Sequence, residues 1–148
     1  MPTLHLICGL PGSGKTTLAR RIEAEAPALW LSPDPWMARV VRDGWDAERR
    51  EAVKAMQMEL ALRALQLGVH VVSDAGYWSR RERDAARKAA AAVGADCRLH
   101  FLDVPIEELC RRLAARNADL PPDTFAVDQD QLDEMAGWFE RPGDDELV

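Results

Sequence analysis

Eight residues near the start of the chain, Gly9-Leu10-Pro11-Gly12-Ser13-Gly14-Lys15-Thr16, have the types and spacing to bind phosphate. They match the pattern G-x-x-x-x-G-K-[ST], in which a glycine-rich loop turns its backbone N–H groups toward phosphate oxygens. In this pattern Lys15 supplies a mobile positive charge for the β- and γ-phosphates, and Thr16 offers its hydroxyl group to Mg²⁺. The pattern therefore predicts a nucleotide site that uses Mg²⁺.

The flanking residues are those that such a loop requires. Residues 3–8 form an apolar run typical of a buried strand, and residues 15–25 have helical spacing that ends before Pro27. The start of a helix adds free N–H groups and a positive dipole end to the loop. The residues expected to bind the nucleotide are Gly9, Leu10, Pro11, Gly12, Ser13, Gly14, Lys15, Thr16 and Thr17.

Two aspartates follow predicted strands. Asp34 comes after residues 28–31, and the prolines on either side of it predict a stiff, extended loop. Asp74 comes after the apolar run of residues 69–73. Ligands of open α/β sheets bind at the carboxyl ends of the strands, so both carboxylates can face the phosphates. We interpret Asp34 as functional, with a turn or helix-cap aspartate as the alternative, whereas Asp74 could hold a magnesium-bound water or orient the substrate.

Aromatic and basic residues accompany these aspartates. Trp36 and Trp45 could line a substrate pocket or belong to the core. Ser79 and Glu82 have the spacing of a capping box, which predicts a helix from about residue 80 to 93. Its first turn lies near the same edge and is either part of the site or a solvated basic face. The arginines of this turn are Arg80, Arg81 and Arg83.

The last third of the chain predicts a lid. Residues 97–102 read as a fourth strand, and a helix follows with Arg112 and Arg116 four residues apart on one face. A proline-rich polar loop then makes residues 116–128 a mobile cover for the nucleotide. Asp128 with Gln131 would cap a final helix, and the acidic end, residues 143–148, is expected to fray or to form a short edge.

The composition describes an ordinary globular protein. The 148 residues are 47% apolar and 30% charged, which predicts one domain over residues 1–148. The formal net charge of −6 makes nucleic acid an unlikely partner, and no apolar run approaches the length of a membrane span. The chain begins directly with a strand, without a secretory signal, and its three cysteines read as reduced core residues, so we expect a cytoplasmic protein.

Strands alternate with helices along the chain, which predicts a parallel sheet with helices on both faces. The longest predicted helix covers residues 47–67. Its expected apolar stripe is Val53, Met56, Leu60, Ala64 and Leu67. The three histidines are spread over different strands, and we expect them to have separate core or surface roles. They are His5, His70 and His100.

The chain resembles the small bacterial P-loop kinases that are often labelled AAA-family ATP-binding proteins or predicted kinases. These are similar in fold to chloramphenicol phosphotransferase, zeta toxins, gluconate kinase and the kinase domain of polynucleotide kinases. The segments that resemble this group are residues 9–17, 31–37, 72–80, 102–105 and 113–117. The resemblance implies an α/β fold, namely the three-layer sandwich of P-loop NTPases, with a mainly parallel sheet, helices on both faces and a short lid.

The resemblance also implies a reaction, the transfer of the γ-phosphate of ATP to a hydroxyl group of a small molecule, with Mg²⁺ as cofactor. Asp34 would be the base and Arg116 the lid arginine. The expected catalytic residues are Lys15, Asp34, Arg112 and Arg116, Arg116 also binding the nucleotide. The expected substrate residues are Asp34, Trp36, Asp74, Tyr77 and Arg80, and the expected metal-site residues are Thr16 and Asp74.

The resemblance leaves the acceptor and the oligomeric state open, because such kinases phosphorylate antibiotics, sugars, nucleotide sugars and polynucleotide ends. A polynucleotide 5′-hydroxyl kinase is one alternative. Against it, polynucleotide kinases often have an arginine three residues after the aspartate, where this chain has Met37. A nucleotide-binding ATPase or switch is the other alternative. No predicted strand ends in the adjacent Asp-Glu pair of motor ATPases, and no Asn-Lys-x-Asp motif for guanine is present.

Overall fold

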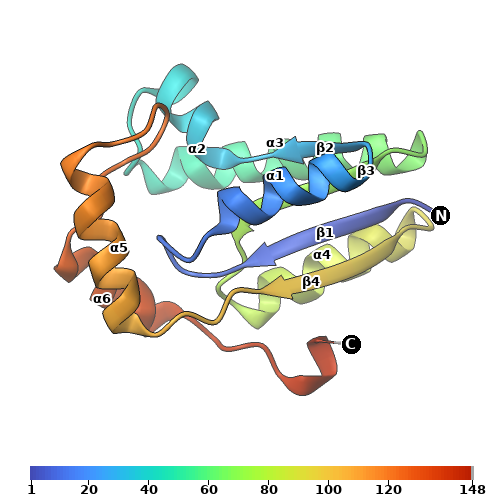
Figure 1. Ribbon diagram of the computed structural model, residues 1–148. Coiled ribbons are helices and arrows are strands. Elements are labelled where there is room, and N and C mark those ends of the chain that lie inside the picture. Colours follow the sequence, from blue (N-terminus) through green and yellow to red (C-terminus); the bar gives the residue numbers. More distant parts are fainter. Residues whose placement is uncertain (148) are drawn as a thin grey trace.

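Four parallel strands form the centre of the structure, a computed structural model that describes residues 1–147 (Figure 1). The strands are β1 (Thr3–Cys8), β2 (Ala28–Leu31), β3 (His70–Gly76) and β4 (Asp96–Phe101). Their order across the sheet is β2-β3-β1-β4, with β1 paired to both β3 and β4. Because all four run the same way, their carboxyl ends meet at one edge of the sheet.

Helices cover both faces of this sheet, which confirms the predicted three-layer α/β sandwich. They are α1 (Lys15–Glu25), α2 (Pro33–Trp36), α3 (Ala47–Gln66), α4 (Arg80–Ala92), α5 (Ile106–Ala118) and α6 (Gln129–Trp138). Figure 1 shows α1 on one face, α3 and α4 on the other, and α5 and α6 beyond the carboxyl ends of the strands. Within residues 1–147, no helix is both long and apolar enough to cross a membrane.

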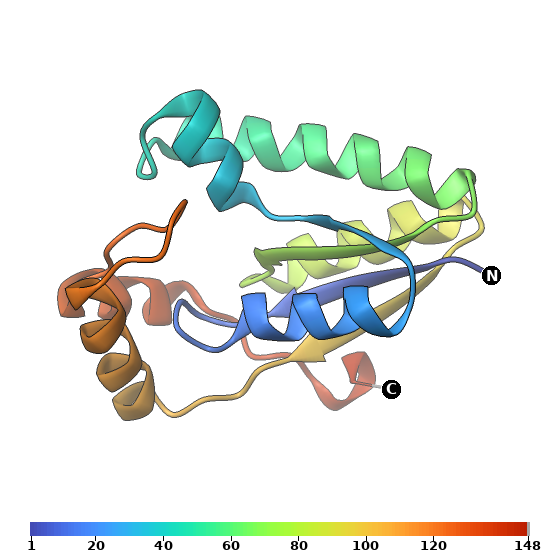
Figure 2. The ribbon, with the colours of Figure 1, turned by 45° about the horizontal axis from the view of Figure 1, so that its top comes forward.

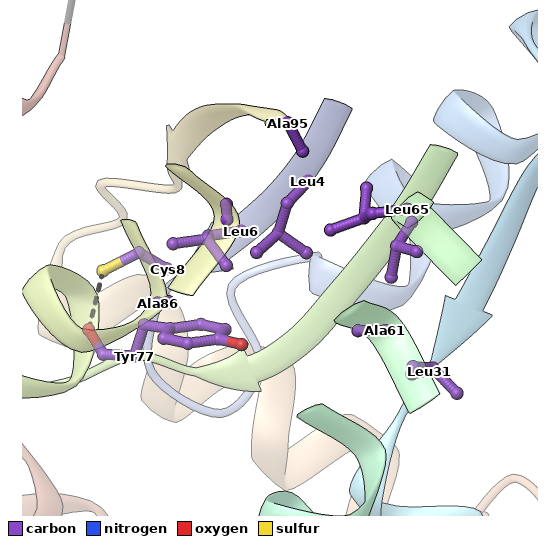
Figure 3. Packing of buried hydrophobic residues seen from close by; sticks show 11 residues of the cluster. Leu4, Leu6, Cys8, Leu31, Ala61, Leu65, Tyr77, Ala86 and Ala95 are labelled. Atoms are coloured by element: carbon purple, nitrogen blue, oxygen red, sulfur yellow. Dashed lines mark hydrogen bonds between the residues drawn. The ribbon is translucent and has the colours of Figure 1, made fainter. Parts of the chain in front are cut away.

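The alternation of side chains along β1 divides the core between the two faces. Leu4, Leu6 and Cys8 pack in one buried cluster with residues of α3 and α4, which Figure 3 shows from close by. Ile7 points to the other face, where it packs with Ala19 of α1. All four of these β1 side chains are fully buried, as expected for one of the two inner strands of the sheet.

Helix α3 buries a different stripe from the predicted one. Its buried residues are Val53, Gln57, Ala61 and Leu65. Met56, Leu60 and Leu67 of the predicted stripe are exposed. The polar Gln57 belongs to the buried face because its amide donates a hydrogen bond to the carbonyl of Ser32. The prediction counted only apolar residues and therefore set the helix at the wrong rotation.

The segment around Asp34 is helical rather than extended, which corrects the prediction for its two prolines. Pro33 is the first residue of α2, where a proline loses no helical hydrogen bond. A π-helical turn, η1 (Met37–Val41), continues α2 and ends at Arg42, whose φ is +63°. Asp34 therefore lies in the first helical turn after β2, at the edge where the strands end.

The predicted lid begins inside the last turn of α5 and continues through an irregular loop to α6. A separate buried cluster, Leu109, Leu113, Val127 and Leu132, holds α5, the end of the loop and α6 together. Asp128 and Gln131 form the expected capping box at the start of α6. In Figure 2 this loop, drawn in orange, extends from α5 toward α2.

Residues 144–146 dock on α4, in contrast to the frayed end or short edge that the sequence predicted for residues 143–148, the last of which lies outside the described residues. A short 3-10 helix, η2 (Asp144–Glu146), brings the carboxylate of Glu146 against Arg83, whose Nε lies 2.8 Å from Glu146 Oε1. Both side chains are buried, and Arg87 contacts the same carboxylate at 2.8 Å. Burial opposes ionisation of Glu146, but hydrogen bonds from Arg83, from the backbone of Gly143 and from Arg87 lower its pKa to about 2.

Replacing this carboxylate by an amide, in Glu146→Gln, would leave the buried guanidinium of Arg83 without its counter-charge. We expect the free energy of unfolding at pH 7 to fall by about 3 kcal/mol, because removing one partner of a buried pair costs roughly 3–5 kcal/mol. Urea unfolding of the wild type and the variant measures this change in the free energy of unfolding. Asp145→Asn is the matched control, since its exposed pair with Arg80 should contribute little to stability. Equal losses in the two variants would contradict the assignment of Glu146 as the anchor.

The three histidines lie on the adjacent strands β3, β1 and β4, although no sequence pattern indicated that they meet. His5 Nδ1 lies 3.0 Å from His100 Nε2, and the ring centroids of His5 and His70 are 6.5 Å apart. Among the described residues they do not form a group that could hold a metal ion. Burial and the charges of His100, Arg98 and His70 lower the pKa of His5 to about 4. Burial, Arg98 and Arg21 also lower the pKa of His100.

A histidine whose pKa falls on folding binds fewer protons in the folded chain than in the unfolded one. We therefore expect stability to decrease as the pH falls from about 6.5 to about 4, the interval between the ordinary and the lowered pKa of His5. In His5→Asn this part of the pH dependence should disappear, so the difference in unfolding free energy between the wild type and the variant should shrink toward pH 4. Urea unfolding at a series of pH values tests this. A difference that stays constant from pH 8 to pH 4 would refute it.

Candidate active site

Lys15 lies at the start of α1, directly after the glycine-rich loop. Gly14 caps this helix with a φ of +97°, a conformation that glycine adopts without strain. The ammonium group of Lys15 donates to the carbonyls of Gly9 at 3.1 Å and Leu10 at 3.0 Å. Burial lowers the pKa of Lys15, and the nearby carboxylates of Asp74 and Asp34 partly offset that effect. The lysine therefore lies within electrostatic range of both predicted carboxylates.

Asp74 is buried at the end of β3, with only 6% of its surface exposed. Its Oδ2 accepts a hydrogen bond of 3.0 Å from the indole Nε1 of Trp30 on β2. Burial raises the pKa of Asp74, and hydrogen bonds from Ser32 and Trp30 together with the charge of Lys15 counteract that rise. The carboxylate is thus held in a fixed position beside Lys15.

Asp34 is more open, and an arginine of α3 holds it. Arg50 Nη1 donates to Asp34 Oδ1 at 2.8 Å, and Nη2 of the same guanidinium donates to the carbonyl of Gly44 at 2.9 Å. The side chain of Asp34 is 47% exposed. Its Oδ2 accepts no hydrogen bond from any residue between 1 and 147. One carboxylate oxygen is therefore fixed by Arg50 and the other is available to a ligand.

Two arginines of α5 approach the same edge. Arg112 Nη1 donates to the carbonyl of Gly12 in the loop at 3.3 Å. Arg116 Nη2 donates to the carbonyl of Phe125 at 3.4 Å, and its buried Nε has no partner among the described residues. Burial lowers the pKa of Arg116, an effect that the charge of Asp34 partly opposes. The predicted lid arginine thus lies near Asp34.

The loop between α5 and α6, residues 119–128, is called the lid loop here. Its contacts with the segment that follows α2 close one side of the site. Arg39 of η1 forms an ion pair with Asp123 of the loop. The ring of Phe125 packs directly on Gly44, where an added Cβ would come within 2.4 Å of the ring. Because Arg50 also binds the carbonyl of Gly44, the lid, Gly44 and Asp34 belong to one connected set of contacts.

The residues fit a magnesium nucleotide. The hydroxyl of Ser13 is buried in the loop without a partner among residues 1–147, as is Arg116 Nε, so donors are available for anionic oxygens. Thr16 lies exposed in the first turn of α1. Within the described chain no cluster of three or more His, Cys, Asp or Glu could hold a metal. The hydroxyl of Thr16, together with phosphate oxygens, would suit Mg²⁺, which prefers oxygen ligands.

The structure brings Lys15, Asp34, Asp74 and Arg116 together, but it places two predicted substrate residues elsewhere. The side chain of Tyr77 is in the core, and its hydroxyl lies 2.6 Å from Ser73 Oγ. Arg80 pairs with carboxylates of the C-terminal segment and of its own helix. Trp36 is half-buried in α2, and Thr17 is exposed beside Thr16.

Three residues of the site were not identified from the sequence. Arg50 is 16 positions after Asp34, and nothing in its spacing relates it to that aspartate. Trp30 lies within β2, and a strand pattern does not show which group its indole N–H contacts. Trp78 Nε1 donates to the carbonyl of Gly9 at 3.0 Å, a contact that depends on the turn after β3. These contacts join residues far apart in the chain.

Solved structures with the same fold include a chain of the Pnkp1/Rnl/Hen1 RNA repair complex. It has a TM-score of 0.77 and 23% identity over 93% of this chain. This chain spans 43% of that chain and 43% of its counterpart in a second structure of the complex. The APS kinase CysC of Mycobacterium tuberculosis, in complex with AMPPNP and APS, has a TM-score of 0.68 and 24% identity, with 95% of this chain and 83% of the other covered.

A gluconokinase from Sinorhizobium meliloti 1021 has a TM-score of 0.68 and 18% identity, with 99% of this chain and 81% of the other covered. At these identities the likeness establishes the fold, which is the α/β fold of small P-loop kinases. No curated protein gives a significant sequence match. A family model described as an AAA domain matches residues 4–142, nearly the whole length, and this chain therefore belongs to the AAA domain family.

Proposed function

We propose that this protein is an ATP-dependent phosphotransferase that moves the γ-phosphate to a hydroxyl group of a small molecule. The observation that supports it most is the meeting of Lys15, Arg116 and the half-exposed carboxylate of Asp34 at one edge of the sheet. Two of the structures with this fold are named as kinases of small molecules, APS kinase and gluconokinase, which agrees with the proposal.

In the proposed reaction, the acceptor oxygen forms a bond to the γ-phosphorus, and the bond from that phosphorus to the β,γ-bridging oxygen breaks. The hydroxyl proton passes to the carboxylate of Asp34, and ADP leaves. Lys15 and Arg116 neutralise the charge of the transferred group, while the backbone N–H groups of the loop hold the phosphates. Bound Mg²⁺ would supply further neutralisation of the β- and γ-oxygens.

The environments of the two aspartates support different roles for them. Asp34 has a free carboxylate oxygen within the described chain and is open to solvent, so it suits the base. Asp74 is buried and accepts a hydrogen bond from Trp30, so its carboxylate has little freedom to move with a substrate. We assign it to support of the metal's water or of the substrate's position.

One observation favours a second candidate, the phosphorylation of a polynucleotide 5′-hydroxyl group. Position 37 is not an arginine, but Arg50 of α3 places a guanidinium group against Asp34. The net charge of −6 remains against a polynucleotide acceptor. A 5′-hydroxyl oligonucleotide therefore belongs in the acceptor panel beside gluconate, nucleosides and aminoglycosides.

From the proposed function, a first prediction concerns the nucleotide. Lys15→Ala should abolish ATP turnover, with a loss on the order of 10²-fold or more, because it removes a charge aimed at the transferred phosphate. Release of ADP measures turnover, and circular dichroism checks the fold. Lys88→Ala, which removes a charge from an exposed residue of α4, is the control. If Lys15→Ala turned over ATP nearly as fast as the wild type, the proposed function would be wrong.

The second prediction separates the aspartates. Asp34→Asn keeps the shape of the side chain but cannot accept the proton, so transfer to the acceptor should be lost while ATP binds with roughly unchanged affinity. Asp74→Asn should instead raise the Mg²⁺ concentration or the acceptor concentration that the reaction requires. Transfer of labelled phosphate to whichever panel member the wild type phosphorylates, measured at several Mg²⁺ concentrations, tests both. Normal transfer by Asp34→Asn with no transfer by Asp74→Asn at any Mg²⁺ level would reverse the roles.

A further inference from the structure

The carbonyl of Gly9, the first residue of the phosphate-binding loop, accepts two hydrogen bonds from side chains. Lys15 Nζ donates to it at 3.1 Å, and Trp78 Nε1 donates at 3.0 Å. Gly9 is buried, and its own N–H donates to the carbonyl of Gly76 at 3.1 Å. The start of the loop is therefore attached to the turn that follows β3.

When a nucleotide binds, one of the two donors would have to leave this carbonyl and the other could stay. Lys15 would have to turn away from the carbonyls of Gly9 and Leu10 to reach phosphate oxygens. A buried carbonyl that loses its only donor costs free energy, so a second donor is needed to hold the loop in that state. The indole of Trp78 donates to the Gly9 carbonyl from the turn after β3, and it can remain in place.

We propose that Trp78 is a positioning residue of the nucleotide site, and that its indole N–H keeps the Gly9 carbonyl hydrogen-bonded when Lys15 moves to the phosphates. This inference rests on the proposed nucleotide-dependent function. It concerns the binding of the nucleotide and is independent of the acceptor.

The backbone before Trp78 is shaped for this contact. Gly76 has a φ of +96°, and an added Cβ would come within 2.8 Å of Trp78 Nε1, so only glycine leaves room for the indole. Tyr77 also has a positive φ, of +50°. Its carbonyl accepts hydrogen bonds from Arg83 Nη1 at 2.9 Å and from the thiol of Cys8 at 3.3 Å, the second of which Figure 3 shows.

The C-terminal segment fixes the same turn from outside. The N–H of Glu140 donates to the carbonyl of Trp78 at 2.7 Å. Arg83, which holds the carbonyl of Tyr77, is itself held by Glu146 at 2.8 Å. The position of the indole is thus determined by contacts of α4 and of the C-terminus.

The test compares Trp78→Phe, which keeps an aromatic ring without the N–H, with Trp138→Phe. Trp138 is 58% exposed and makes no side-chain hydrogen bond among residues 1–147. Calorimetric titration with ADP and Mg²⁺ should show roughly 10-fold weaker binding in Trp78→Phe, because the bound state alone loses the last donor to Gly9. Binding by Trp138→Phe should equal that of the wild type.

Stability of the free protein distinguishes positioning from a merely structural role. In the free protein Lys15 still bonds the Gly9 carbonyl, so Trp78→Phe should lower the melting temperature little. In the Lys15→Met background the same change should lower it clearly more, because no donor then remains. If Trp78→Phe lowered the melting temperature equally in both backgrounds, the inference that Lys15 and Trp78 share the Gly9 carbonyl would be wrong.

A further measurement requires no variant to fold. The indole N–H resonance of Trp78 in the wild type should be protected from exchange, and ADP should increase that protection. Unchanged or reduced protection, or equal ADP affinity of Trp78→Phe and the wild type, would overturn the inference and leave the proposed function intact. If the wild type bound no ADP, both the inference about Trp78 and the proposed function would be wrong.

Discussion

The partly buried ammonium group of Lys15 is the charge on which the arrangement of this edge depends. A cation partly removed from water at the start of α1 must be compensated by carbonyls or carboxylates, and the fold provides both. Two carbonyls of the loop accept its hydrogen bonds, and Asp74 and Asp34 lie within range of its charge. A parallel sheet makes this possible because successive strands deliver their carboxyl ends to the same place.

Two arms extend from this edge and meet each other. One consists of α2, η1 and the start of α3, and includes Asp34 and Arg50. The other consists of the end of α5 and the lid loop, and includes Arg116. The ion pair of Arg39 with Asp123 and the packing of Phe125 on Gly44 join them. The candidate base and the candidate lid arginine therefore belong to segments whose positions are coupled.

The sequence predicted the strand and the helix on either side of the glycine-rich loop, because this part of the candidate site is one continuous stretch of chain. It also predicted the parallel sheet, the helices on both faces and the capping box of Asp128 with Gln131. It missed contacts that depend on three-dimensional packing, such as Arg50 with Asp34. The C-terminus was misjudged for the same reason, since an acidic tail reads as solvated until the buried Arg83 is seen beside it.

The two halves of the site also differ in how firmly they are held. The proposed phosphate half rests on partly or fully buried contacts, which include the Gly9 carbonyl with Trp78, Asp74 with Trp30, and Arg83 with Glu146. The acceptor half rests on partly exposed ion pairs, such as Asp34 with Arg50, which individually contribute about 0–1 kcal/mol. Changes on the acceptor side therefore cost little stability, whereas changes under the loop disturb the core. A fold built in this way could keep the proposed phosphate site while the proposed acceptor side is altered, which would explain why a sequence pattern identifies the loop and not the acceptor.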